Sequence, residues 1–188
     1  MFFKDDTDRD VGWAVTDTFP LLDPTWVSTN VIEPRLQLFD DPRVPYLIGR
    51  LGMAGEGSPQ RGYLEQCLVR GIPAVQARAL RALAALRVDS KRTMCEDVVA
   101  GNWPAVREKG MHLPQEIAEE DRNRLLNAAM ESLRDIGTAE SIAALRVARQ
   151  QTVDMTITLR QLSFDVAEDI YWRLTGGLSG ENFETGKG

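Results

Sequence analysis

The sequence predicts an all-α fold, a short right-handed alpha-solenoid of about four to five helix pairs with one insertion. Three observations support this fold class. Apolar residues recur at steps of three and four, helix start signals recur at a nearly constant spacing, and short glycine-containing turns join successive helices. Each expected helix carries one apolar stripe, so each must bury that stripe against a neighbour.

The start signals define the repeat. They fall at Asp10, Asp41, Ile72, about Asp121 and about Asp154, and an acidic residue or a following proline marks each. Two of the four intervals are about 31 residues long and the last is about 33, which is the length of one helix pair. The third interval is longer by roughly the stretch 101–117, which therefore reads as an irregular insertion.

In chain order, the first expected helix is 10–22, and Pro20 disturbs its last turn. The second begins at Asp23–Pro24, and Pro34 should kink or end it near Glu33. Further helices are expected over 42–51 with an end at Gly52, over 59–70, over 73–86, and over about 91–100 with Asp89 and Ser90 as the cap.

The stretch from Asp121 to Leu174 shows the unit most fully. Its first helix ends at Gly137, where glycine is expected to adopt the left-handed conformation cheaply. Thr138 can then cap the second helix, with Ser141 three positions on as in a capping box. A third helix is expected over about 154–174.

These elements divide the chain into three parts, a polar segment 1–9, a repeat domain 10–174 and a glycine-rich tail 175–188 that we expect to be disordered. The net charge is −6, with 22 basic and 28 acidic residues, which disfavours polyphosphates and anionic membranes as partners. No apolar run is long enough to span a membrane, and the acidic N-terminus does not resemble a signal peptide. We therefore expect a cytoplasmic protein.

Few residues of the chain are candidates for catalysis or for binding a metal or cofactor. Cys67 and Cys95 lack metal-ligand spacing and are expected to be small buried side chains. His112 is the only histidine, and no phosphate-binding loop with its lysine is present. The sequence predicts no catalytic residue, no cofactor and no metal site.

Two segments carry a family resemblance. AVQARALRALAAL and AAMESLRDIGTAESIAALRVA resemble the Ala/Leu helix, glycine-containing turn and second Ala/Leu helix of HEAT-like (armadillo-type) repeats. The resemblance implies a scaffold, an adaptor or the regulatory or sensor segment of a larger assembly. A tetratricopeptide array has a similar period, but its Trp and Tyr positions are not matched here.

In such an array the second helix of each pair lines the concave face, where partners usually bind. The expected partner-binding residues combine basic side chains of these helices with a tryptophan of the insertion, namely Arg61, Arg70, Lys91, Arg92, Arg146, Arg149 and Trp103. The simpler alternatives are a solvated face of mixed charge, and a Trp103 that covers core between two imperfectly stacked repeats.

The leading interpretation is a non-catalytic protein–protein interaction module that binds a partner protein or acidic peptide on its concave face. The aromatic residues Phe164, Tyr171 and Trp172 suggest a covered end, and self-association through apolar ends is therefore an alternative. A HEAT-like nucleic-acid-binding protein or a lyase-type enzyme is the other alternative. The weakly basic face disfavours the first of these, and only fold analogy supports the second.

Overall fold

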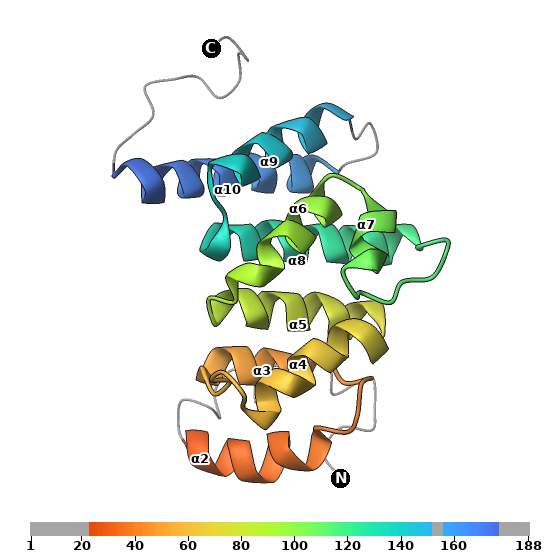
Figure 1. The fold of residues 1–188 in the computed structure, drawn as a ribbon, viewed down its shortest axis with the longest axis vertical. Helices are drawn as coiled ribbons and strands as arrows, with labels where there is room; N and C mark the ends of the chain where they lie inside the picture. The colour runs from red at the N-terminus through yellow and green to blue at the C-terminus, as the bar shows by residue number, and fades with distance from the viewer. Residues whose placement is uncertain (1–22, 152–155, 177–188) are drawn as a thin grey trace.

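The computed structural model describes residues 23–151 and 156–176, and every regular element in these ranges is helical (Figure 1). The expected helix 10–22, the polar segment 1–9 and nearly all of the glycine-rich tail lie outside the described residues. In chain order the elements are α2 (Pro24–Val27), η2 (Ser28–Ile32), η3 (Glu33–Arg35), α3 (Arg43–Leu51), α4 (Pro59–Arg70), α5 (Pro73–Ala85), η4 (Asp89–Lys91), α6 (Arg92–Val99), α7 (Trp103–Glu108), α8 (Glu119–Ile136), α9 (Ala139–Gln151) and α10 (Ile157–Thr175).

The helices stack in order along the long axis of the molecule. Helix α5 packs against α3 on one side and α8 on the other, and α8 packs in turn against α10 (Figure 1). Helices α4, α6 and α9 pack against α5, α8 and α10 respectively, and α6 also contacts α9. Helix α2 lies at one end of the stack, and α9 and α10 lie at the other. Among the helices described, none combines the length and the apolar character that a bilayer span requires.

The helical geometry changes at Glu33, near which the sequence predicted that Pro34 would kink or end the helix. The chain stays helical past Pro34 to Arg35, but it changes from α to π geometry at Ser28 and to 3-10 geometry at Glu33. The amide of Glu33 donates to the carbonyl of Ser28, five residues back. Because proline has no N–H to donate, a wider turn before it lets the helix continue with its hydrogen bonds rearranged.

The predicted start signals agree with the structure at two proline-led helices. The carboxylate of Asp23 accepts from the amide of Trp26 at 2.9 Å, and the hydroxyl of Ser58 accepts from the amide of Arg61 at 3.2 Å. The predicted cap at Asp89 is wrong. Residues 89–91 form a 3-10 turn, and α6 begins at Arg92 without a side-chain cap.

Gly137 ends α8 for a reason other than the one predicted. Its φ is −68°, in the extended region rather than the left-handed one. A Cβ at this position would lie 2.4 Å from the carbonyl oxygen of Leu133 and 2.6 Å from Cδ1 of Ile170. Glycine is required because α8, the turn and α10 approach closely here, not because φ is positive.

Of the two hydrogen bonds of the expected capping box, the turn after Gly137 shows the one that Ser141 accepts. The hydroxyl of Ser141 accepts from the amide of Thr138 at 3.0 Å and donates to Glu96 of α6 at 2.6 Å. Ser141 is fully buried, so one hydroxyl both satisfies the start of α9 and fixes it to α6. At the C-terminal end of α8, Arg173 of α10 donates to the carbonyl oxygens of Asp135 and Gly137 at 2.8 and 2.5 Å.

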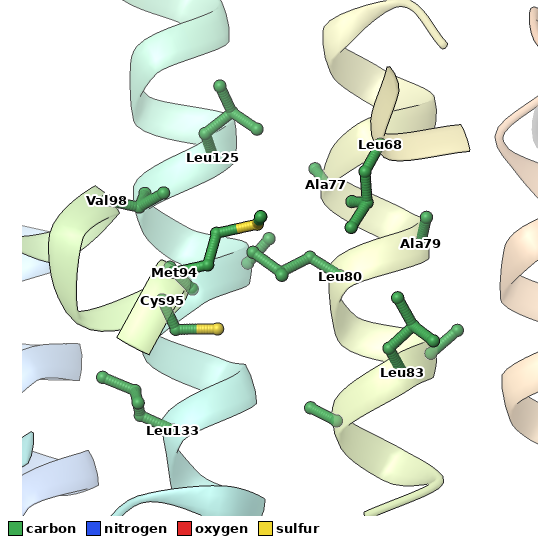
Figure 2. Packing of buried hydrophobic residues seen from close by; sticks show 14 of the residues in the cluster. Leu68, Ala77, Ala79, Leu80, Leu83, Met94, Cys95, Val98, Leu125 and Leu133 are labelled. Carbon is green, nitrogen blue, oxygen red and sulfur yellow. The ribbon is translucent and has the colours of Figure 1, made fainter. Parts of the chain in front are cut away.

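The centre of the core lies between α5, α6 and α8. In Figure 2 the side chain of Leu80 points from α5 toward α8 and α6, where Met94 and Cys95 project from α6. These residues are buried together with Leu125 and Leu133 of α8. Alanines occupy many of the other buried positions of α5, so its neighbours can approach it closely on several sides.

The stretch 101–117 is more ordered than the irregular insertion that the sequence predicted. Residues 103–108 form α7, which packs on α6, and the chain after it buries Met111 and Leu113. The anchor is Gln76, a fully buried residue of α5. Its side-chain amide donates to the carbonyl of Leu68 at 3.0 Å and to that of His112 at 2.7 Å, and the amide of His112 donates to Leu68 at 3.1 Å.

Two helical glycines give a matched pair for testing the close packing of α3 on α5. A Cβ on Gly49 would lie 2.9 Å from Cα and Cβ of Ala82, whereas one on Gly62 meets nothing within 4 Å. Glycine to alanine within a helix is worth about 0.5–1 kcal/mol from backbone entropy alone. We expect Gly62→Ala to raise the free energy of unfolding by that amount and Gly49→Ala to lower it, as measured by urea denaturation. Equal gains from both substitutions would contradict the close approach of α3 and α5.

Gln76 provides a second test, because its role requires a hydrogen-bond donor. Gln76→Glu loses both donations and places a carboxylate beside two carbonyl oxygens, so it should cost several kcal/mol of unfolding free energy at pH 7. Gln76→Leu should cost less, because it also removes the side-chain oxygen, which has no partner among the described residues.

The cost of Gln76→Glu should shrink as the pH is lowered and the carboxyl gains a proton that it can donate. The exposed Gln66 on α4 supplies the control Gln66→Glu. Hydrogen exchange at the amide of His112 should accelerate in both Gln76 variants and not in the control. Unchanged exchange there would show that Gln76 does not anchor the stretch.

Candidate functional site

The seven predicted partner-binding residues are spread over the length of the molecule. Arg61 and Arg70 lie at the two ends of α4, Lys91 and Arg92 lie at the start of α6, and Arg146 and Arg149 lie on α9. Trp103 is the first residue of α7. Of these seven residues, only Arg146 and Arg149 line the same hollow.

Several of the other basic residues have partners within their own region. The guanidinium of Arg61 lies 3.7 Å from Glu65, and that of Arg92 lies 3.6 Å from Glu96, in both cases one helical turn away. Arg70 lies over the ring of Phe39, with 4.3 Å from its guanidinium carbon to the ring centroid. For these residues, the alternative of a solvated helix face of mixed charge describes the geometry well.

Trp103 is half-buried and packs against the core, which agrees with the alternative reading of this residue as a cover. His112 is exposed, and its main chain rather than its ring makes the contacts to Leu68 and Gln76. Neither residue lines the hollows described below.

Helices α9 and α10 enclose two adjoining hollows. A narrow cleft is lined by Leu145, Arg146, Arg149, Ser163, Phe164 and Ala167. A wider hollow of about 670 Å³ is lined by Arg149, Ile157, Arg160, Gln161 and Phe164. Because Arg149 and Phe164 belong to both, we treat the two together and call them the α9–α10 site.

The α9–α10 site combines positive charge with apolar surface. Among the residues that the structure describes, its lining contains three arginines, Arg146, Arg149 and Arg160, and no acidic residue. The apolar part is Phe164, which is half-buried, and Ile157, which is 87% exposed at the start of α10. The nearest acidic residue on α10, Asp165, accepts a hydrogen bond from Gln161 at 2.8 Å.

The acidic residue at the start of α9 is engaged elsewhere. The hydroxyl of Thr138 donates to the carboxylate of Glu140, and this hydrogen bond lowers the pKa of Glu140. Glu140 is therefore held at the start of the helix, away from the arginines of the last turns.

The two cysteines are fully buried. Burial raises the pKa of Cys67 to about 12, although a hydrogen bond with Tyr63 acts in the opposite direction. Burial likewise raises the pKa of Cys95 to about 12. Such thiols are poor nucleophiles at neutral pH, because the thiolate is the reactive form. Within the described ranges, no group of three or more His, Cys, Asp or Glu side chains is placed to hold a metal ion.

Comparison of the chain with protein-family models, curated proteins and solved structures finds no match in any of the three.

The sequence predicted the residues on the α9 side of the α9–α10 site but not those on the α10 side. The spacing of Arg146 and Arg149 on a single helix was visible in the chain. Arg160, Phe164 and Ile157 come from the next helix, and their approach to α9 depends on the angle and register between the two helices. The exposed aromatic surface expected on 154–174 was the only signal that pointed to them.

The raised thiol pKa values predict how stability depends on pH. A thiol in the unfolded chain titrates near 9.0, whereas both folded thiols titrate near 12. Their contribution to stability is therefore complete below pH 9 and is lost as the pH rises from 9 to 12. At pH 10.5 we expect a loss on the order of 1–2 kcal/mol per thiol relative to pH 8.

Urea denaturation of the native chain and of Cys67→Ala/Cys95→Ala at both pH values measures this loss. The double variant should retain only the part due to Tyr63, whose phenol pKa is also raised by burial. An identical pH dependence in the two proteins would contradict the burial of the thiols.

Proposed function

We propose that this protein is a HEAT-like helical-repeat module that binds another protein through the α9–α10 site. The observation that carries the proposal is the described lining of that site, in which three arginines lie beside Phe164 and the exposed Ile157 and the described residues include no acidic one. The serial packing of α3, α5, α8 and α10, with α4, α6 and α9 against them, supports the repeat architecture. Among the described helices, the main contacts join elements that are neighbours in this stack, which is the pattern of a solenoid.

The chemistry of the lining indicates the class of partner. Three guanidinium groups favour a segment with carboxylates, which they can bind through paired N–H donors. Phe164 and Ile157 favour an apolar side chain beside those carboxylates, because burying it removes apolar surface of both partners from water. The best-fitting partner is therefore a protein segment that carries acidic residues next to an aromatic or aliphatic one.

Nucleic acid is a poorer candidate. The chain carries a net charge of −6, and the α9–α10 site offers only three arginines to a polyanion whose binding depends on neutralising many phosphates. The lyase alternative gains no support from the two thiols, which burial keeps in the unreactive form at neutral pH.

A peptide-binding measurement tests the proposal. We expect fluorescein-labelled peptides with degenerate sequence, fixed at two glutamates and one phenylalanine, to bind the native chain as measured by anisotropy. The same library with lysine in place of glutamate should not bind. Arg146→Glu/Arg149→Glu should weaken binding at least tenfold, because it reverses two charges of the lining.

The matched control is Arg61→Glu/Lys91→Glu, which makes the same change of charge at two predicted residues outside the hollow. The control should bind like the native chain, and thermal melting should show that both variants remain folded. If the control loses as much affinity as Arg146→Glu/Arg149→Glu, the net charge of the chain rather than the α9–α10 site determines binding. If neither library binds, the proposal fails.

A further inference from the structure

A second hollow lies across α5 and α8 and shares no residue with the α9–α10 site. It has a volume of about 590 Å³ and is lined by Pro42, Ala74, Ala77, Arg78, Arg81, Glu120, Arg124, Asn127 and Ala128. We call it the α5–α8 groove. Its residues come from the first half of α8 and the first two-thirds of α5, together with the residue before α3.

The groove has a small-residue floor and basic sides. Ala74, Ala77 and Ala128 are small, so a bound group can approach the helices closely between the longer side chains. No large apolar side chain lines it, and an apolar partner would therefore gain little there. Three guanidinium groups and the amide of Asn127 face one carboxylate, that of Glu120.

Each of the three arginines is held in a different way. Arg124 donates to Asp121 at 2.8 Å and to Glu120 at 2.6 Å, both on its own helix. Arg78 lies over the ring of Tyr46, 5.5 Å from its centroid. The guanidinium of Arg81 lies 3.6 Å from Glu131, beyond hydrogen-bond distance, while Glu131 accepts from Arg134 at 3.1 Å.

These contacts leave some guanidinium N–H donors of the groove available to a ligand. Arg81 is the clearest case, because its side chain is 42% exposed and no hydrogen bond joins it to the rest of the described chain. Ion pairs between exposed or partly exposed side chains contribute little to stability, so an incoming anion can exchange with Glu120, Asp121 or Glu131 at little cost. An exchange gains affinity only when the new anion binds better than the carboxylate it replaces.

The requirement that the new anion bind better than a carboxylate indicates which class of ligand fits the groove. A carboxylate on a partner would replace one carboxylate with another. A phosphate monoester carries nearly two negative charges and three acceptor oxygens, so it can accept paired hydrogen bonds from two arginines at once. The groove is also much larger than one phosphoryl group, which leaves room for the chain that carries it.

We propose that the α5–α8 groove binds a phosphorylated peptide segment, with the phosphoryl group held between Arg81 and Arg124 and supported by Arg78. This site stands on its own observation and does not depend on the α9–α10 site. The lining offers three arginines, which are too few for a polyphosphate backbone, whose binding depends on neutralising many phosphates.

Fluorescence anisotropy with a labelled peptide library of fixed central phosphoserine and degenerate flanks tests the proposal. The phosphoserine library should bind the native chain at least tenfold more tightly than the same library with serine or glutamate at the centre. Inorganic phosphate at millimolar concentration should compete. Phosphate that binds as tightly as the peptides would overturn the peptide part of the proposal and leave an anion site alone.

The variant for this test is Arg81→Gln/Arg124→Gln, and its matched control is Arg50→Gln/Arg122→Gln, which removes the same charge outside the groove lining. The first should lower the affinity for the phosphoserine library at least tenfold, and the second should change it less than twofold. Equal affinity of the two double variants would overturn the proposal.

Amide NMR shifts of the native chain locate the bound peptide without any substitution, in case a variant fails to fold. Titration with the phosphoserine library should shift Ala77, Asn127 and Ala128. Shifts confined to α9 and α10 would place the phosphopeptide in the other site and overturn the assignment to the α5–α8 groove. Arg146→Glu/Arg149→Glu should leave phosphopeptide binding unchanged, which separates this proposal from the one above.

Discussion

Helix α5 lies between α3 and α8 with α4 across it, and eight of its thirteen residues are buried. Such a helix can have neighbours on three sides only if its side chains are small, and its alanines provide this. The contact between Gly49 and Ala82 shows how little room remains on the α3 side. Since α4 packs on α5, α6 packs on α8, and α7 packs in turn on α6, the spacing of α5 and α8 determines the position of most of the structure.

Small residues of α5 and α8 also shape the surface of the molecule. Ala74, Ala77 and Ala128 leave a depression where α5 and α8 meet solvent, and Arg78, Arg81 and Arg124 stand at its sides because they are the exposed positions of the same helical turns. The groove is thus a consequence of close helix packing. At the other end of the stack, α10 has no further helix beyond it in the described chain, so Phe164 and Ile157 remain partly or largely exposed.

The sequence predicted those features of the fold that depend on local chemistry. Asp23 and Ser58 start helices through side-chain acceptors, and Gly52 ends one with a φ of 63°, as glycine in that position allows. Features that depend on contacts between helices were predicted less well. Gly137 is required by Ile170, which is distant in the chain, and Gln76 orders the stretch 101–117 through hydrogen bonds that no local pattern reveals.

For the candidate sites too, the sequence showed the local spacing of residues but not the contacts between helices. Arg146 and Arg149 could be paired from their spacing, but the spacing could not distinguish them from Arg61 and Arg92, which lie beside carboxylates one turn away. Nor could it identify the α5–α8 groove, whose basic residues come from helices on either side of the predicted insertion. Assigning a role to an arginine required the position of the nearest carboxylate, and that position depends on helix register.

The two proposed sites also suggest how an acidic chain could bind anionic segments. A net charge of −6 repels a long polyanion at a distance, and this repulsion grows with the number of charges that the polyanion carries. A short segment with one or two anionic groups experiences little of it, and in the proposed sites it would meet arginines that line the same hollow. On the two proposals above, the overall charge and the local lining have complementary roles, the first disfavouring nucleic acid and anionic membranes and the second favouring short anionic segments of other proteins.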